Sequence, residues 1–127
     1  MTIRVLVVDD HPVLRAGLEA VLRAEPGFLP VGGAADGREL EELLGRTEPN
    51  VVILDRHLED EDGLELCRDL RTRPEPPEVI LYTADTDAGL EAAARDAGAF
   101  TVIEKGANVD RLFDAVRLAA RARRSVA

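Results

Sequence analysis

The segment IRVLVVDD, residues 3–10, joins a run rich in β-branched residues to two adjacent carboxylates. The run has the length of a strand, and β-branched and aromatic residues favour strands. Similar runs, each followed by polar or turn residues, recur at Phe28–Val31, Val51–Leu54, Val79–Tyr82 and Phe100–Ile103. The run at Phe28–Val31 is the weakest of them. The sequence therefore predicts five strands, the first at Ile3–Val8.

Apolar residues recur at intervals of three and four positions between and after these runs, as they do on one face of a helix. This spacing is found within residues 14–22, 40–44, 63–70, 90–97 and 109–120. Strands and helices therefore alternate, and strands that are apolar almost throughout are covered on both faces. The pattern predicts an α/β domain with a five-stranded, doubly wound parallel sheet, right-handed crossovers and helices on both faces.

The composition is that of one globular domain. The chain has 127 residues, of which 46% are hydrophobic and 32% are charged, a balance that excludes a disordered chain and a membrane span. The first ten residues lack the basic leader and cleavage site of a signal peptide, so we expect a cytoplasmic protein without membrane contact. The single cysteine, Cys67, excludes an internal disulfide and is expected in the core.

Charge is distributed unevenly along the chain. The formal net charge of −9 argues against nucleic-acid binding by the chain as a whole. The last eleven residues nevertheless contain no acid and four arginines, which are Arg117, Arg121, Arg123 and Arg124. We therefore expect one domain over residues 1–120. Residues 121–127 are then either a solvated basic tail that ends the last helix or the start of a linker to a further domain.

Polar side chains gather where the predicted strands end, which is the edge at which open parallel sheets bind ligands. Four of the five strands end in a charged or reactive side chain, namely Asp9 with Asp10, Asp55, Thr83 and Lys105. Three carboxylates in one crevice repel one another by about 4 kcal/mol per pair at ~4 Å and an effective dielectric constant of ~20. A cation should offset this repulsion, and ligation by oxygen alone suits Mg²⁺.

The two remaining side chains indicate which chemistry this edge supports. Lys105 supplies a fixed positive charge and Thr83 a hydroxyl donor, and together they can bind the oxygens of a transferred phosphoryl group. Carboxylates are known nucleophiles that form aspartyl phosphates. The combination therefore favours phosphoryl transfer over acyl transfer.

Five segments in this order and at this spacing resemble the signature of response-regulator receiver domains over nearly the whole chain. They are VLVVDDHP at residues 5–12, VVILD at 51–55, DGLE at 62–65, Thr83-Ala84 and Lys105. The His11-Pro12 pair and the following LRAGL, residues 14–18, are similar to the subgroup whose receivers usually precede a helix-turn-helix DNA-binding domain.

The resemblance implies a flavodoxin-like sheet in the strand order 2-1-3-4-5 and a phosphoacceptor at Asp55. It implies that a sensor histidine kinase donates the phosphoryl group in a Mg²⁺-dependent reaction, with Thr83 and Lys105 assisting. The ion would be bound by Asp10, Asp55 and the backbone carbonyl of His57, and Asp9 would reach it through water.

The same resemblance implies a signalling switch rather than a metabolic enzyme. Such a switch catalyses its own phosphorylation and dephosphorylation and forms a homodimer when phosphorylated. It controls an output, in this subgroup transcription, and contacts DNA only through an output domain outside this chain.

Four positions depart from the family pattern. Gly106 follows Lys105 where proline is usual, so a cis peptide bond is not expected there. Val102 stands where an aromatic switch residue is common, which argues against a rotating ring coupled to the threonine. In the loop after the phosphoacceptor, Glu59 replaces a common proline and Asp60 a common glycine. Because residues 59–62 are all acidic, we expect a different loop geometry and slower attack on anionic donors.

Other interpretations were weighed for individual residues. Asp9 and Asp10 could cap the first helix instead of binding a metal. His11 and His57 are expected to make local polar contacts rather than to bind a metal through their rings. A calcium loop over the acidic run is rejected because Leu58 occupies the position of the first ligand.

Two other functions are compatible with the predicted fold. A flavin-binding electron carrier would need a phosphate loop rich in Ser, Thr and Gly after the first strand, and more aromatic residues than the 3% present. A pseudo-receiver, which keeps the fold as a phosphorylation-independent interaction module, is the stronger alternative. It usually lacks one of the five polar positions, and all five are present here.

Overall fold

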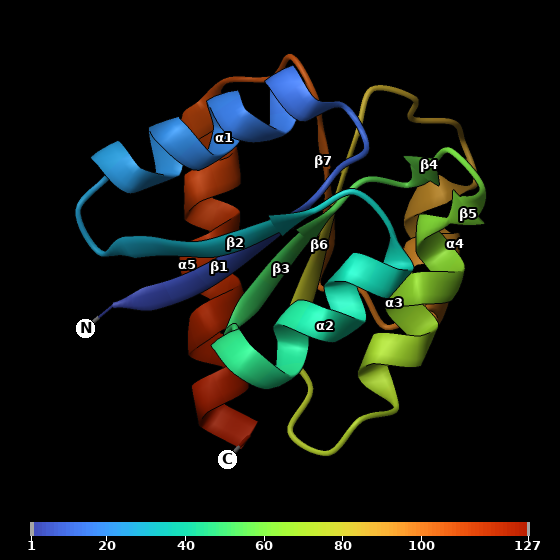
Figure 1. The fold of residues 1–127 in the computed structure, drawn as a ribbon. Helices are drawn as coiled ribbons and strands as arrows, with labels where there is room; N and C mark the ends of the chain where they lie inside the picture. Colours follow the sequence, from blue (N-terminus) through green and yellow to red (C-terminus); the bar gives the residue numbers. More distant parts are fainter. Residues whose placement is uncertain (1, 127) are drawn as a thin grey trace.

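A five-stranded sheet in which every neighbouring pair is parallel runs through the computed structural model, which describes residues 2–126 (Figure 1). The strands lie in the order β2-β1-β3-β6-β7, which is 2-1-3-4-5 when only the strands of this sheet are counted. Their bounds are β1 Ile3–Val8, β2 Phe28–Ala34, β3 Val51–Leu54, β6 Glu78–Thr83 and β7 Thr101–Glu104. The predicted fold class and strand order are confirmed.

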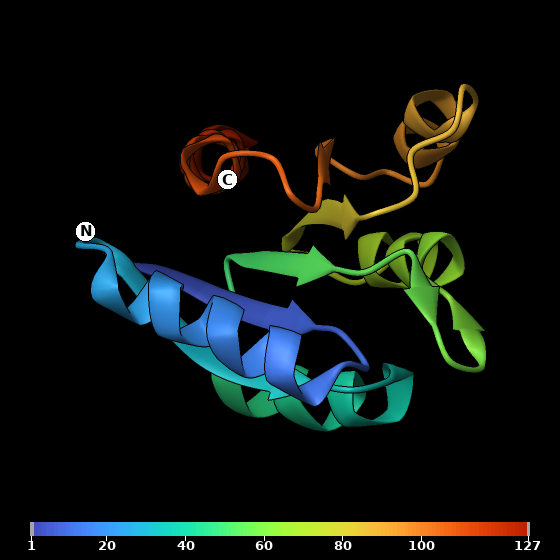
Figure 2. The same cartoon turned by 90° about the horizontal axis from the view of Figure 1, so that it is seen from above.

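Five helices cover the two faces of this sheet, as predicted. They are α1 Pro12–Ala24, α2 Gly37–Thr47, α3 Gly63–Arg71, α4 Leu90–Asp96 and α5 Val109–Val126. Helices α1 and α5 lie on one face and α2, α3 and α4 on the other, as the two perpendicular views show (Figures 1 and 2). All strands point to the same edge of the sheet, so the loops that follow them meet there.

The sheet separates two hydrophobic cores, and β1 shows how one strand serves both. Val5 and Val7 pack with α1 and α5, whereas Leu6 and Val8 pack with the helices on the opposite face. All four side chains are at most 1% exposed. This two-sided burial explains why the strands are apolar almost throughout instead of alternating with polar residues.

The second core contains Cys67, as expected. The thiol donates a hydrogen bond to the carbonyl oxygen of Ala97 at 3.4 Å, and burial raises the pKa of Cys67 to about 11. Gly98, with φ 90°, follows the C-cap residue of α4 in the left-handed conformation that commonly ends a helix. Among the described residues, no helix is both long enough and apolar enough to cross a membrane.

The structure differs from the sequence prediction mainly at strand bounds and in the acidic run. Strand β2 continues to Ala34. Strand β7 begins at Thr101, so that Phe100 lies just before it and is 37% exposed. The acidic run belongs to a small antiparallel hairpin of β4 His57–Leu58 and β5 Glu61–Asp62. This hairpin was not predicted, because acidic residues have a low strand propensity.

The arginine-rich end of the chain continues the last helix, and whether it leads into a further domain stays a prediction. Helix α5 runs to Val126, and Arg123 donates hydrogen bonds to the carbonyl oxygens of Glu75 and Pro76 at 3.1 and 3.2 Å. The side chain of Arg124 and the whole of Ala127 lie outside the described residues. The last turns of α5 are thus attached to the loop between α3 and β6.

A pair of glycine substitutions tests how closely α3 packs on the loop after β3. A Cβ atom at Gly63 would lie 2.3 Å from the carbonyl oxygen of Asp55, whereas one at Gly45 in α2 would meet nothing within 4 Å. We expect Gly63→Ala to lower the free energy of unfolding by about 1–3 kcal/mol, the usual cost of overpacking. Gly45→Ala should raise it by about 0.5–1 kcal/mol through helix propensity. Equal urea midpoints for the two variants would contradict this close packing.

Candidate functional site

Backbone hydrogen bonds continue past the strand ends and fix the residues that follow. Asp9 donates its N–H to Ala34 at 2.9 Å, Asp55 to Val8 at 3.0 Å and Lys105 to Thr83 at 2.8 Å. Each acceptor is a carbonyl oxygen in a neighbouring strand. The main chain therefore sets the position of three predicted site residues at one edge of the sheet.

Lys105 forms the electrostatic centre of this edge. Its Nζ atom lies 2.8 Å from Asp9 Oδ2 and 3.1 Å from Asp55 Oδ2. The three side chains are largely withdrawn from water, with exposed fractions of 13% for Lys105, 3% for Asp9 and 6% for Asp55. Lys105 is also the only lysine in the sequence, whose other Lys or Arg positions are all arginines. A compact ammonium thus bridges two buried carboxylates.

These contacts lower the pKa of Asp9 and raise the pKa of Lys105, so they favour the charged form of each side chain. Burial alone would raise the pKa of Asp9, but hydrogen bonds from Lys105 and from the backbone and ring of His11 outweigh it and lower the pKa. Burial would likewise lower the pKa of Lys105, and the hydrogen bonds and charges of Asp9 and Asp55 raise it instead. Asp9 and Lys105 are therefore both charged at neutral pH.

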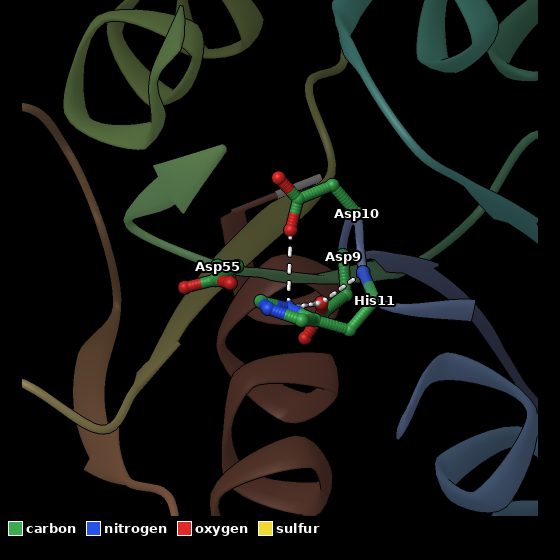
Figure 3. Close-up of side chains that lie close together, drawn as sticks. All are labelled: Asp9, Asp10, His11 and Asp55. Carbon is green, nitrogen blue, oxygen red and sulfur yellow. Dashed lines mark hydrogen bonds and ion pairs between the residues drawn. The ribbon is translucent and has the colours of Figure 1, made fainter. Parts of the chain in front are cut away.

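The second oxygen of Asp9 and the carboxylate of Asp10 both face the ring of His11 (Figure 3). Asp9 Oδ1 accepts the backbone N–H of His11 at 2.9 Å and lies 3.0 Å from the ring atom Nδ1. Asp10 Oδ1 lies 3.1 Å from the same nitrogen and is buried without a hydrogen-bond partner. Helix α1 has His11 as its N-cap residue, with no side-chain cap, so neither aspartate acts as the predicted alternative cap.

The residues at this edge fit a divalent cation. Asp9, Asp10, His11 and Asp55 can each place one ligand atom so that all four lie within 4.8 Å of one another. Lys105 balances only one of the three carboxylate charges, and the buried Asp10 Oδ1 has no hydrogen bond. An unpaired buried oxygen is costly, and a hard cation ligated by carboxylates removes that cost.

Thr83 and His57 reach the same edge from β6 and β4. Thr83 is 1% exposed, and its hydroxyl oxygen accepts the backbone N–H of Asp85 at 3.2 Å. His57 donates its backbone N–H to Asp55 Oδ1 at 3.2 Å, while its ring pairs with Asp85 at 3.4 Å. The expected local contact of the His57 ring is therefore present. The role of the His57 carbonyl as a metal ligand stays a prediction.

One departure from the family pattern, at Gly106, has a structural explanation here. Gly106 has φ 92°, a left-handed conformation that proline cannot adopt, and no peptide bond among the described residues is cis. The hairpin of residues 57–62 is tied to the start of α2 because Glu61 accepts the backbone N–H of Gly37 at 2.8 Å. Val102 is partly buried against the core under α2, α3 and α4.

Sequence reasoning missed two arginines that order this edge. Arg15 donates a hydrogen bond to the carbonyl oxygen of Asp9 at 2.6 Å. Arg56 bonds to Asp87 at 3.2 Å, and this hydrogen bond is the main reason why the pKa of Asp87 is lowered. Arg56 adjoins the predicted phosphoacceptor and Asp87 follows the next strand of the sheet. The opposite charges of Arg56 and Asp87, each a few residues after one of two neighbouring strands, were the sequence signal that could have predicted this contact.

A family model described as "Response regulator receiver domain" matches residues 5–117. The chain is 33% identical over 119 residues to the transcriptional regulatory protein LiaR of Bacillus subtilis, covering 94% of this chain and 56% of that protein. It is 40% identical over 126 residues to a protein-glutamate methylesterase/protein-glutamine glutaminase of Agrobacterium fabrum, covering 93% of this chain and 35% of that protein. The chain thus spans only part of these curated relatives.

Solved structures agree with this result. The crystal structure of a two-component response regulator of the LuxR family from Aurantimonas sp. superposes with a TM-score of 0.89 at 28% identity. The match covers 96% of this chain and 87% of that one.

The buried oxygen of Asp10, which has no hydrogen bond, leads to a stability test. Asp10→Asn removes one repelling charge and one predicted ligand, so without metal the variant should be at least as stable as the unchanged protein. A ligand that binds only the folded state adds about 2.7 kcal/mol at a hundredfold excess over its Kd. Mg²⁺ should therefore raise the melting temperature of the unchanged protein but barely that of Asp10→Asn.

Asp114→Asn is the matched control, because it removes one aspartate charge from an exposed position on α5. This variant should keep the full Mg²⁺ response. Identical melting curves for Asp10→Asn and the unchanged protein at every Mg²⁺ concentration would place the ion elsewhere.

Proposed function

We propose that this chain, which belongs to the response regulator receiver domain family, accepts a phosphoryl group on Asp55 in a Mg²⁺-dependent reaction. The observation that carries the proposal is the position of Asp55. Its carboxylate is 6% exposed, contacts Lys105 at 3.1 Å and belongs to the same cluster as two further aspartates. Such a carboxylate is withdrawn from water yet kept close to cationic partners.

The reaction needs one nucleophilic oxygen of Asp55 and a phosphorylated donor. That oxygen attacks the phosphorus while the bond to the leaving group breaks, which is the P–N bond of a phosphohistidine or the P–O bond of acetyl phosphate. The leaving imidazole takes up a proton from solvent, and acetate leaves as the anion. The product is an acyl phosphate on Asp55.

Two side chains of the chain itself stabilise the transferred group. Lys105 presents its ammonium beside Asp55, where negative charge develops on the phosphoryl oxygens. The Thr83 oxygen accepts the N–H of Asp85, which leaves the hydroxyl hydrogen available to a phosphoryl oxygen.

The proposed ion site uses the carboxylates of Asp10 and Asp55 and the backbone carbonyl of His57, with Asp9 reached through water. When bound, Mg²⁺ supplies positive charge that neutralises the phosphoryl oxygens and orients the donor. Water that enters the same site hydrolyses the acyl phosphate, so the domain also catalyses its own dephosphorylation. It acts as a switch rather than as a metabolic enzyme.

The proposed partners are a sensor histidine kinase as donor, in the cytoplasm, and a second copy of the chain once Asp55 is phosphorylated. Control of transcription through a separate DNA-binding domain is the favoured output. Support comes from LiaR, whose name is that of a transcriptional regulator and of which this chain covers 56%. The methylesterase relative shows that a receiver of this family also occurs with an enzymatic output.

Mass spectrometry after incubation with acetyl phosphate and Mg²⁺ tests the phosphoacceptor. We expect one added phosphoryl group, and none in Asp55→Asn because the amide is a poor nucleophile. Asp60→Asn is the control, since it removes an exposed carboxylate from the neighbouring hairpin loop and should keep the labelling. Equal labelling of Asp55→Asn and the unchanged protein would refute the assignment. No labelling of either would favour the pseudo-receiver.

Removal of Lys105 should change both the acid stability and the phosphoryl response. The pKa of Asp9 lies below its ordinary value of 3.8, so ionised Asp9 stabilises the folded state above that pH. This contribution disappears as the pH falls through the lowered pKa. In Lys105→Ala the hydrogen bond and the charge of the lysine no longer offset the effect of burial, so the pKa of Asp9 rises. The free energy of unfolding should then increase less between about pH 3 and 5 than in the unchanged protein.

Urea unfolding over this pH range measures the difference, and Arg38→Ala is the control because its guanidinium is 77% exposed. Lys105→Ala should remain folded at neutral pH but give a weaker response to acetyl phosphate. An unaltered pH profile together with unaltered labelling would reduce Lys105 to a surface charge.

A further inference from the structure

The ring of His11 occupies a position that a hydrogen bond alone does not explain. Its Nδ1 atom lies 3.0 Å from Asp9 Oδ1 and 3.1 Å from Asp10 Oδ1 (Figure 3). One ring nitrogen carries at most one proton, so it can donate to only one of these two oxygens. Asp10 Oδ1 is the oxygen left buried and without a hydrogen bond.

The main chain holds His11 firmly in this position. Its N–H donates to Asp9 Oδ1 at 2.9 Å, and its carbonyl oxygen accepts the N–H of Arg15 at 2.9 Å. The ring therefore starts from a fixed Cα atom directly beside the carboxylates. Its side chain is 67% exposed, so the other ring nitrogen is free to carry the proton toward solvent.

The distance between Nδ1 and Asp10 Oδ1 matches the geometry of a metal site. Two ligand atoms at right angles around an ion, each about 2.1 Å from it, lie about 3.0 Å apart. Nδ1 and Asp10 Oδ1 are 3.1 Å apart, and Asp9 Oδ1 lies 3.0 Å from the same nitrogen. One ion can therefore contact Nδ1 and Asp10 Oδ1 directly, with Asp9 reached through water, whereas a single proton on Nδ1 can serve only one of the two oxygens.

We propose that His11 supplies an imidazole nitrogen to the ion, so that the site prefers transition metals such as Mn²⁺ to Mg²⁺. The inference rests on the ion site of the proposed function and replaces the expectation that the His11 ring makes only local polar contacts. Imidazole suits the later first-row transition metals best, and Mn²⁺, the weakest binder of that series, still accepts a nitrogen ligand more readily than Mg²⁺, which keeps oxygen ligands and water. A nitrogen ligand added to carboxylates thus raises the affinity for Mn²⁺ more than that for Mg²⁺.

Isothermal titration of the unchanged protein and of His11→Asn with MgCl₂ and with MnCl₂ tests the preference. Asparagine keeps the backbone contact to Asp9 and a polar side chain but lacks the imidazole. We expect the ratio of Mn²⁺ affinity to Mg²⁺ affinity to fall about tenfold in His11→Asn. Circular dichroism checks that the variant is folded.

Pulsed electron paramagnetic resonance of bound Mn²⁺ gives an independent readout. An imidazole ligand produces a nitrogen coupling in the spectrum, and we expect this coupling in the unchanged protein and its loss in His11→Asn. The chain has only two histidines, so a coupling that persists in the variant would exclude His11 as its source and overturn the inference.

Labelling by acetyl phosphate with Mg²⁺, measured on the same samples, separates the inference from the proposed function. An unchanged affinity ratio with normal labelling would overturn the role of His11 and leave the phosphoacceptor in place. A higher Mn²⁺ affinity after removal of the imidazole would also overturn it, because the ring would then compete with the ion. Absence of both ion binding and labelling in the unchanged protein would remove both proposals.

Discussion

The parallel hydrogen-bond ladder of the sheet continues one residue beyond its strands, and the rest of the site depends on this extension. The N–H groups of Asp9, Asp55 and Lys105 each bond to a carbonyl oxygen of the adjacent strand. These bonds fix the Cα positions of charged residues before their side chains make any contact. The energy that holds three charges together at one edge therefore comes from the buried sheet, whose strands lie in two hydrophobic cores.

The ladder brings three carboxylates close together, and the neighbouring side chains offset their repulsion only in part. Lys105 offsets the charge shared by Asp9 and Asp55, and together with the hydrogen bonds from His11 it outweighs the effect of burial and lowers the pKa of Asp9. A lysine suits this role because its ammonium is a compact point charge, whereas the planar guanidinium of arginine is larger. Asp10 has no such partner, and its buried oxygen remains without a hydrogen bond. The described residues therefore form a group that fits a cation before any donor arrives.

How well the sequence predicts a feature depends on how far apart in the chain the interacting residues lie. Strand ends follow from local patterns of apolar residues, so the meeting of Asp9, Asp55 and Lys105 at one edge was predictable. The hairpin at residues 57–62 was not, because its strands pair in spite of acidic composition and are tied to Gly37 of another element. The left-handed conformation of Gly106 could not be predicted either, because the missing proline indicated only that a cis bond was not expected. Contacts between side chains from separate loops have no periodic signal in a single sequence.

The two sides of the site differ in how strongly they are held. Residues fixed by the ladder cannot move without breaking buried backbone hydrogen bonds. The loop of residues 84–89 is exposed and contacts the loop after β3 through the ion pair Arg56–Asp87 and the contact between the His57 ring and Asp85. Exposed contacts of this kind stabilise a structure only weakly, because water and salt screen the charges. Of the two sides of the site, the loop of residues 84–89 is therefore the more weakly held, because its contacts are exposed whereas those of the ladder are buried.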